Sequence, residues 1–390
     1  MKIKKLLCMV VSAAAIISLT GCADLEPAAL QTSAPSAESS TEAPSGTENK
    51  TAEADTEGGG KVIAGFLFDG YIDDAGWNFE HNKGRLAVEE AGIKTIYKEN
   101  VPQTQDCEKV MQDFINQGAA IIFGTSFGFM EYMDEMALKY PEVTFLHCGG
   151  YLNEDNYYNY QGRQYESRFL SGIIAASVSK TGKIGYVGGY EIAQVIRGIN
   201  AFTLGAQLVN PDIEVQVAWT HTWDDAAVEK AAGQTLIDNG CDVLTCHETT
   251  SASLMPAEEN PDVYAIGFTT DVSELLPTSY LTSSAFNWAA YCKPTAEAIA
   301  AGTWEKANYW GGLGDGTVYL TPYSEAVPRE AADLAEEYKN KIIDGSYHIF
   351  EGPILGQDGS MMVEEGQILT DEELNNMMYF VKGVTGSIEQ

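Results

Sequence analysis

Residues 61–92, KVIAGFLFDGYIDDAGWNFEHNKGRLAVEEAG, join a short apolar run to a helical stretch through a crowded turn. The run KVIAGFLF does not alternate between polar and apolar residues, which is typical of a strand covered on both faces. A structural turn needs a glycine and a capping aspartate, whereas this one carries three aspartates before Trp77. The stretch therefore predicts a strand–turn–helix unit whose turn does more than start a helix.

The same pattern of an apolar run followed by a helical stretch repeats along the chain. Further runs are KTIYKE, AAIIFG and VTFLHC, and after residue 165 the rhythm restarts with KIGYVGG, IEVQVAWT, CDVLTC and VYAIGF. Strands that alternate with helices indicate parallel sheets. We predict an α/β fold of two doubly wound lobes, joined around residues 150–165, with a ligand cleft at the carboxyl ends of the strands.

Composition agrees with a globular protein and excludes one class of partner. The 390 residues are 45% apolar and 20% charged, and this length suggests two domains. The formal net charge is −33, which argues against nucleic acid, because phosphates bind basic surfaces.

Residues 1–60 differ from the rest of the chain. Met1–Lys5 holds three lysines and Leu6–Leu19 is mostly apolar, as in a secretory signal. Leu19-Thr20-Gly21-Cys22 resembles the lipobox of bacterial lipoproteins, so we expect residues 1–21 to be a signal peptide and Cys22 to carry a lipid anchor to the membrane. A plain secretory signal or an anchor helix is the alternative, although the apolar run is short for a span. Residues 22–60 lack aromatics and predict a disordered tether.

Cysteine usage indicates neither a disulfide framework nor a metal site. Five cysteines lie beyond the tether, an odd number at irregular spacing. Cys241 and Cys246 would face opposite sides of one strand, so they could not share a metal there. We predict buried thiols.

The loops that follow the predicted strands are rich in aromatic and hydrogen-bonding side chains. The candidate ligand-binding residues are Asp69, Trp77, Asn78, Ser126, Phe127, Tyr165, Glu191, Trp223, His247, Asp271 and Trp288. Residues of these loops also have structural alternatives. The neighbouring Asp74 and Asp224 could cap helices, Trp77 could pack on its own lobe, and His247 could be a core histidine. Capping does not explain two tryptophans beside caps on different lobes, and two facing aromatics can hold a flat ring.

Motifs of catalysis are missing from the sequence. There is no G-x-G-x-x-G after the first strand, no Walker lysine, no G-x-S-x-G elbow and no H-E-x-x-H. We expect no catalytic residue, cofactor or metal. An extracytoplasmic enzyme such as a nucleoside hydrolase, or a sensor lipoprotein, stays open as the alternative to a binding protein.

Several stretches, in order, resemble the basic membrane protein family, also called purine nucleoside receptor-like proteins, which are substrate-binding lipoproteins of ABC importers. They include DDAGWNFEHNKG, FGTSFGFM, LIDNGCDVLTCHETTSA and WEKANYWGGLGDGTVYL, within residues 61–322. The resemblance implies the type I periplasmic-binding-protein fold, with residues 61–160 plus 281–312 in the N-terminal lobe and 161–280 plus 313–390 in the C-terminal lobe. It also implies an extracytoplasmic monomer, a small-molecule ligand, and permease and ATPase partners.

Departures from the family pattern bear on the ligand. Trp77 and Trp223 take the places of the two phenylalanines that stack on the base in the nucleoside-binding branch. That branch's ribose-binding aspartate aligns with Thr269, and its ribose-binding lysine aligns with Phe286. The TW, CHETTSA and FNW pattern is similar to a sister branch that looks like purine nucleobase binders. The resemblance therefore implies a purine base held between two tryptophans, with a purine nucleoside as the alternative.

Overall fold

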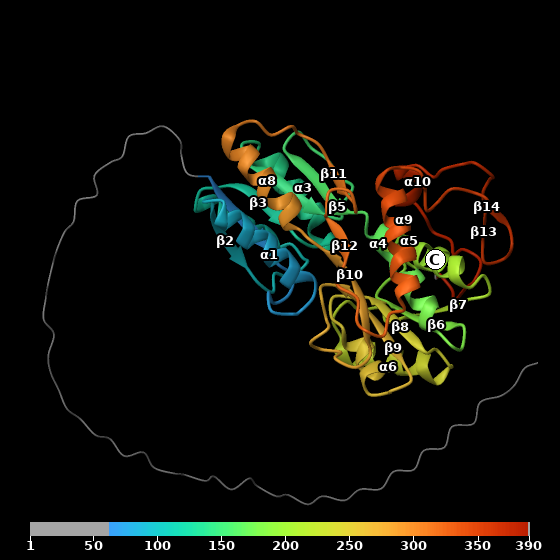
Figure 1. The fold of residues 1–390 in the computed structure, drawn as a ribbon. Helices are drawn as coiled ribbons and strands as arrows, with labels where there is room; N and C mark the ends of the chain where they lie inside the picture. Colours follow the sequence, from blue (N-terminus) through green and yellow to red (C-terminus); the bar gives the residue numbers. More distant parts are fainter. Residues whose placement is uncertain (1–61, 389–390) are drawn as a thin grey trace, which may run out of the picture. The chain divides into compact units, whose positions relative to one another are not determined.

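The computed structural model describes residues 62–388, which fold into two α/β lobes (Figure 1). The predicted signal peptide at residues 1–21, the predicted lipidation site Cys22 and the predicted tether at residues 22–60 lie outside the described residues. Within residues 62–388, no helix is long and apolar enough to cross a membrane.

The first lobe is built on a six-stranded sheet in the order β11-β5-β4-β3-β1-β2, with every neighbouring pair parallel. Its strands are β1 (Ile63–Leu67), β2 (Lys94–Lys98), β3 (Ala119–Gly124), β4 (Thr144–Cys148), β5 (Tyr157–Gly162) and β11 (Tyr309–Gly311). Its helices are α1 (Trp77–Glu90), α2 (Asp106–Asn116), the 3-10 turn η1 (Phe127–Phe129), α3 (Met130–Lys139) and α8 (Ala289–Ala301).

Consecutive residues of these strands point to opposite faces, and helices cover both faces. Phe66 packs in the core on the side of α1 and α8, whereas the next residue, Leu67, packs with α2 and α3. Phe123 and Ile122 divide in the same way. Strands buried on both faces read as continuous apolar runs, which is why KVIAGFLF and AAIIFG lack alternation.

The second lobe is built on a seven-stranded sheet in the order β12-β10-β9-β8-β6-β7-β15, parallel except for the edge strand β12. Its strands are β6 (Lys183–Gly188), β7 (Glu214–Trp219), β8 (Val243–His247), β9 (Tyr264–Thr269), β10 (Tyr280–Phe286), β12 (Val318–Leu320) and β15 (Val384–Thr385). Its helices are α4 (Gln164–Val178), α5 (Ala193–Val209), α6 (Ala226–Asp238), the 3-10 turn η2 (Ala252–Leu254), α7 (Met255–Glu258) and α9 (Arg329–Ile343).

The chain passes between the sheets three times: from β5 to α4, from β10 to α8, and from β11 to β12. The first lobe, predicted as residues 61–160 plus 281–312, was expected to resume at residue 281, but β10 pairs with β9 in the second sheet, so the chain returns to the first lobe after Phe286. With α8, which packs against α1 at Gly84, the first lobe is resumed. The other predicted lobe boundaries remain predictions, whereas the predicted fold class is confirmed.

The C-terminal part, irregular in the sequence, forms a small addition to the second lobe. It contains a two-stranded antiparallel ribbon and a short capped helix, namely β13 (Ile354–Leu355), β14 (Met361–Val363) and α10 (Asp371–Asn375). Asp371 receives both guanidinium arms of Arg163, at 2.7 and 2.6 Å, where β5 passes into α4. This segment therefore braces one of the three crossovers.

Candidate ligand-binding cleft

A cavity of about 540 Å³ lies where the carboxyl ends of both sheets meet. The first lobe contributes Asp69, Trp77, Gln103, Ser126, Phe127, Cys148 and Gly149, and the second contributes Tyr190, Ile192, Gln194, Trp223, His247, Glu248, Thr249 and Phe268. Most of these residues lie at or just after the carboxyl end of a strand, which is where open α/β sheets bind ligands. The volume falls in the range of small-molecule sites.

Trp77 is the first residue of α1 and forms part of the wall on the first lobe. Its indole N–H donates to the carbonyl oxygen of Thr125 at 2.7 Å. The ring packs edge-on against Phe286 and Trp288, with centroids 5.5 and 5.6 Å apart. These contacts hold the plane of the indole in this arrangement of the lobes.

Trp223 forms part of the wall on the second lobe, in the loop after β7. Its carbonyl oxygen accepts from the backbone N–H of Thr249 at 2.9 Å, and its ring lies 5.0 Å from that of Tyr190. Gly189 lets the indole lie directly on the chain, because a methyl group there would come within 2.4 Å of the ring. Each lobe thus presents one restrained indole to the cavity.

Asp69 is the acidic group of the first wall. One carboxylate oxygen accepts from Gln103 Nε2 at 3.0 Å, while the other, Oδ1, is buried with no partner among the described residues. Burial is the main cause that raises the pKa of Asp69, and the nearby polar side chains of Ser126 and Asn78 oppose this shift. The carboxyl group can therefore accept from a polar ligand edge at little further cost in desolvation.

Two further carboxyl groups lie buried in the second lobe. Glu248 lines the cavity and accepts from the Thr220 hydroxyl at 2.8 Å, and Glu229 accepts from the Thr250 hydroxyl at 2.5 Å. Burial, reinforced by the proximity of Glu229, raises the pKa of Glu248 to about 8, and burial raises that of Glu229 to about 7. At neutral pH the pair holds at least one proton, since two buried like charges are costly together.

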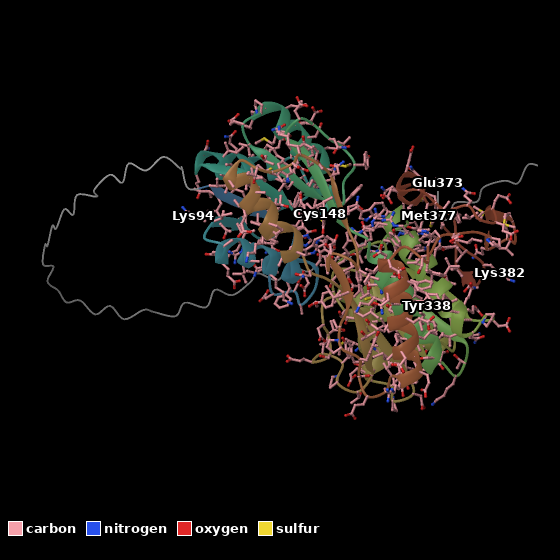
Figure 2. All side chains as sticks on the ribbon, turned by 45° about the horizontal axis from the view of Figure 1, so that its top comes forward. Lys94, Cys148, Tyr338, Glu373, Met377 and Lys382 are labelled. Carbon is pink, nitrogen blue, oxygen red and sulfur yellow. The ribbon has the colours of Figure 1, made fainter. Side chains whose placement is uncertain are left out.

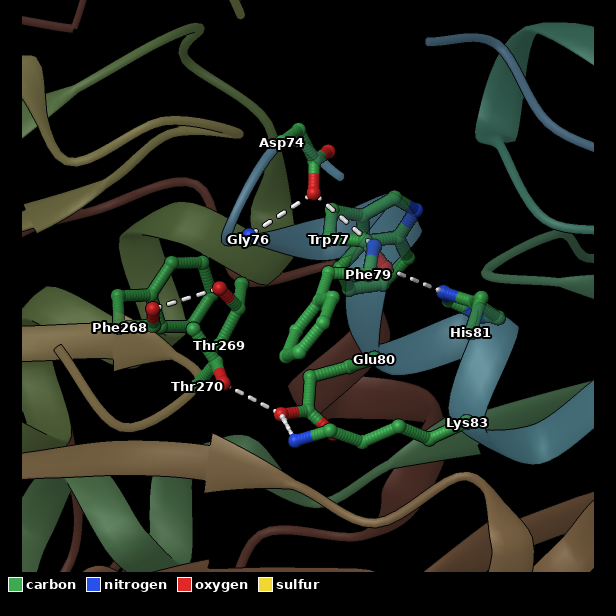
Figure 3. A network of polar contacts seen from close by, with 10 residues as sticks. All are labelled: Asp74, Gly76, Trp77, Phe79, Glu80, His81, Lys83, Phe268, Thr269 and Thr270. Atoms are coloured by element: carbon green, nitrogen blue, oxygen red, sulfur yellow. Dashed lines mark hydrogen bonds and ion pairs between the residues drawn. The ribbon is translucent and has the colours of Figure 1, made fainter. Parts of the chain in front are cut away.

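The lobes touch beside the cavity (Figure 3). A methyl group at Gly76 would come within 2.0 Å of the Thr249 carbonyl oxygen, so only glycine permits this approach. The Thr270 hydroxyl donates across the gap to the Glu80 carboxylate at 2.5 Å, and Lys83 pairs with the same carboxylate oxygen at 2.7 Å. The structure is thus a closed arrangement of the two lobes.

The turn that presents Thr270 is strained. Its neighbour Thr269 has φ +69°, a left-handed conformation that is unfavourable for a β-branched residue. Such strain persists where the surrounding structure enforces it, often at ligand clamps and switch regions.

Six predicted site residues line the cavity. They are Asp69, Trp77, Ser126, Phe127, Trp223 and His247. Asp74 caps α1, accepting from the backbone N–H groups of Gly76, Asn78 and Phe79, as the structural alternative predicted. The capping prediction for Asp224 is wrong by one residue, because Asp225 accepts from the backbone of Ala227 and Val228.

The other five candidates lie away from the cavity wall. Asn78 is buried and donates to Asp74 at 3.0 Å, and Trp288 is buried in the core, stacked on Phe286 at 4.7 Å. Glu191 faces His221 at 3.5 Å. Asp271 accepts from the backbone of Ser273, and Tyr165 lines a separate hollow beside the C-terminal segment.

Residues on the wall that the list of candidates did not include are Gln103, Gln194, Glu248 and Phe268, among others. Glu248 directly follows the candidate His247 in the HETT stretch, so its position after a predicted strand could have identified it. Gln103 lies in a loop that no motif distinguished. The prediction of buried thiols is confirmed for the five cysteines beyond the tether, including Cys148 at the end of β4 (Figure 2). Across residues 62–388, no group of three or more His, Cys, Asp or Glu could hold a metal ion.

Residues 61–351 match the family model described as "ABC transporter substrate-binding protein PnrA-like". The chain is 36% identical to a purine-binding protein of Brucella abortus over 333 residues, which is 85% of this chain and 95% of that protein. It is 32% identical to a Haloferax volcanii protein, provisionally named as an ABC transporter glucose-binding protein, over 90% of this chain and 89% of that one.

A solved ABC-transporter solute-binding protein from Aeropyrum pernix superposes with a TM-score of 0.65 at 21% identity, covering 81% of this chain and 98% of that one. This likeness supports the type I periplasmic-binding-protein fold. The family comprises solute-binding proteins rather than enzymes. These binding proteins act outside the cytoplasm, together with a permease and an ATPase. The chain belongs to the PnrA-like family of ABC-transporter substrate-binding proteins, here also called the basic membrane protein family.

Proposed function

We propose that the protein binds a purine nucleobase, such as adenine or guanine, between Trp77 and Trp223 and delivers it to an ABC permease. One indole comes from each lobe, so a flat ligand between them would also hold the lobes together. Stacked aromatic rings contribute about 0.5–1.5 kcal/mol beyond burial. The purine-binding relative from Brucella abortus is consistent with this class of ligand.

The observation that carries the choice of base over nucleoside is the burial of Phe286. It is 1% exposed and packs against Trp77 and Phe268, with centroids 5.5 and 5.9 Å away. In the nucleoside-binding branch a lysine aligned with this position would bind ribose. A buried ribose hydroxyl with no partner would cost about 1–3 kcal/mol. The cavity volume does not select against a nucleoside, and Phe286 lies behind the wall rather than on it, so the proposed selection rests on the missing lysine at this aligned position.

The polar groups of the wall suit the edge of a heterocycle. Asp69 and Gln103 stand on one lobe, and Gln194, His247 and Glu248 on the other. They offer donors and acceptors together, whereas a simple cation would need acceptors alone. The name of the Haloferax volcanii relative makes a sugar the second candidate, because hydroxyl groups also bind such mixed walls.

A thermal-shift panel of adenine, guanine, adenosine, inosine and glucose, with a nucleoside-hydrolysis assay alongside, tests the ligand class. A ligand at one hundred times its Kd should stabilise the protein by about 2.7 kcal/mol. We expect the bases to give the largest shifts. A shift with glucose alone would reverse the assignment, and steady release of base from adenosine would indicate an enzyme.

We also propose that the mature protein is a lipoprotein anchored through Cys22. The lipobox-like Leu19-Thr20-Gly21-Cys22 and the polar residues that follow it support this anchor. Cys22→Ala should release the protein or leave an uncleaved precursor, visible by fractionation and mass spectrometry. A mature, membrane-bound Cys22→Ala variant would contradict the anchor.

A further inference from the structure

Gln164 lies behind the cavity and contacts His247, which is on the wall. It is the first residue of α4, immediately after the crossover from β5, and is 1% exposed. Its side-chain nitrogen lies 3.3 Å from the backbone carbonyl oxygen of Gln194. A carbonyl oxygen can only accept, so this contact requires that the amide nitrogen, not the amide oxygen, faces it.

The same amide nitrogen lies 3.3 Å from Nδ1 of His247. An amide nitrogen only donates, so Nδ1 must accept and carries no proton. Burial, together with the charges of Arg168 and Arg197, lowers the pKa of His247 well below its usual value. The ring is therefore neutral, and a neutral imidazole with a bare Nδ1 carries its proton on Nε2.

Nε2 of His247 is not used by the protein itself. Within residues 62–388 it has no hydrogen-bond partner, and unlike Nε2 of His81 it is not fully buried. His247 lines the cavity and its ring rests on Phe268, with centroids 4.3 Å apart. The cavity thus has an unused N–H donor at a fixed place on its wall.

We propose that Gln164 is a positioning residue that holds His247 as an Nε2–H donor, so that the site selects ligands with an acceptor at this point. The ligand class, a ring nitrogen or carbonyl oxygen of a purine base, rests on the proposed function, whereas the tautomer does not. Gln164, Gln194 and His247 all belong to the second lobe. The donor is consequently set before the lobes close, which lowers the cost of ordering on binding.

Nuclear magnetic resonance tests the tautomer without a ligand. Two-bond proton–nitrogen correlations of the ligand-free protein report which ring nitrogen carries the proton, and His247→Gln assigns the signal. We expect protonated Nε2 in the wild type and a mixture of tautomers in Gln164→Met. Gln207→Met is the matched control, since Gln207 also donates to a backbone carbonyl oxygen, that of Lys382, at 2.7 Å. A proton on Nδ1 in the wild type, or an unchanged tautomer in Gln164→Met, would overturn the inference.

Calorimetry with adenine and its 1-, 3- and 7-deaza analogues tests selection. The analogue that lacks the nitrogen facing His247 should bind about tenfold more weakly to the wild type and the Gln207→Met control. In Gln164→Met this penalty should shrink to less than about threefold, because the donor is no longer fixed. Equal binding of all analogues by the wild type, or an undiminished penalty in Gln164→Met, would refute the role of Gln164. Failure of adenine itself to bind would instead remove the purine assignment and leave the tautomer to the resonance experiment.

Discussion

Thr270→Val should weaken ligand binding without touching the ligand. The Thr270 hydroxyl donates to Glu80 on the other lobe, so this bond exists only while the lobes are together. Valine keeps the size of the side chain and removes the donor. A hydrogen bond to a charged group contributes about 1.5–3 kcal/mol, and Glu80 keeps Lys83 as a partner at 2.7 Å. We therefore take the lower end of that range, which corresponds to about a tenfold loss of affinity.

The loss should be the same for every ligand, since the bond stabilises closure and contacts no ligand. Titration calorimetry with a base and a nucleoside would measure it. Thr278→Val is the matched control, because the Thr278 hydroxyl donates to Glu258 at 2.6 Å within the second lobe alone. Affinity within twofold of the wild type for Thr270→Val, or an equal loss in Thr278→Val, would refute the contribution of this contact to closure.

Three further perturbations follow from the same geometry. Trp77→Ala and Trp223→Ala should each weaken binding by roughly one to two orders of magnitude in calorimetry, because each half-buried indole would lose the face that the ligand covers, and covering a large apolar side chain is worth about 1.5–3 kcal/mol; full affinity in both would exclude the clamp. Gly76→Ala should keep the fold by circular dichroism but hold the lobes apart in small-angle scattering, because the added methyl group would meet the Thr249 carbonyl oxygen. A scattering profile equal to that of the wild type would contradict the need for glycine at this contact. Burial raises the pKa of Glu248 from 4.5 to about 8, so the folded protein keeps a proton that the unfolded chain releases between these values. The free energy of unfolding should fall as pH rises through this window, and Glu248→Gln should flatten the fall in urea titrations; an equally steep fall in the variant would contradict the shift.

The sequence was sufficient to predict the two parallel sheets, because doubly covered strands such as KVIAGFLF have a distinctive apolar pattern. The sequence also indicated Trp77 and Trp223 as residues of the cleft, since each lies in the segment that follows a strand. The place of Trp288 was harder, because the loop after β10 leads into a crossover and its indole turns into the core against Phe286. Asp271 lies away from the cavity wall for a local reason. Its carboxylate accepts a hydrogen bond from the backbone N–H of Ser273 and so stabilises the turn.

Contacts between elements distant in the sequence could not be predicted from periodicity. Gln164 and His247 are 83 residues apart, and Glu80 and Thr270 are 190 apart. Both pairs depend on how the tertiary fold brings the ends of distant elements together, which local patterns do not encode. Gln103 reaches Asp69 across 34 residues for the same reason.

Recognition of a purine without its sugar is tested most directly by the ratio of two dissociation constants, measured by titration calorimetry on the wild-type protein for adenosine and for adenine. The buried aromatic side chain at Phe286 and the absence of a carboxylate at Thr269 leave ribose without its aligned partners. An unpaired hydroxyl costs about 1–3 kcal/mol, so adenosine should bind about tenfold or more weakly than adenine. Adenosine that binds as tightly as adenine, or more tightly, would contradict a nucleobase-selective site.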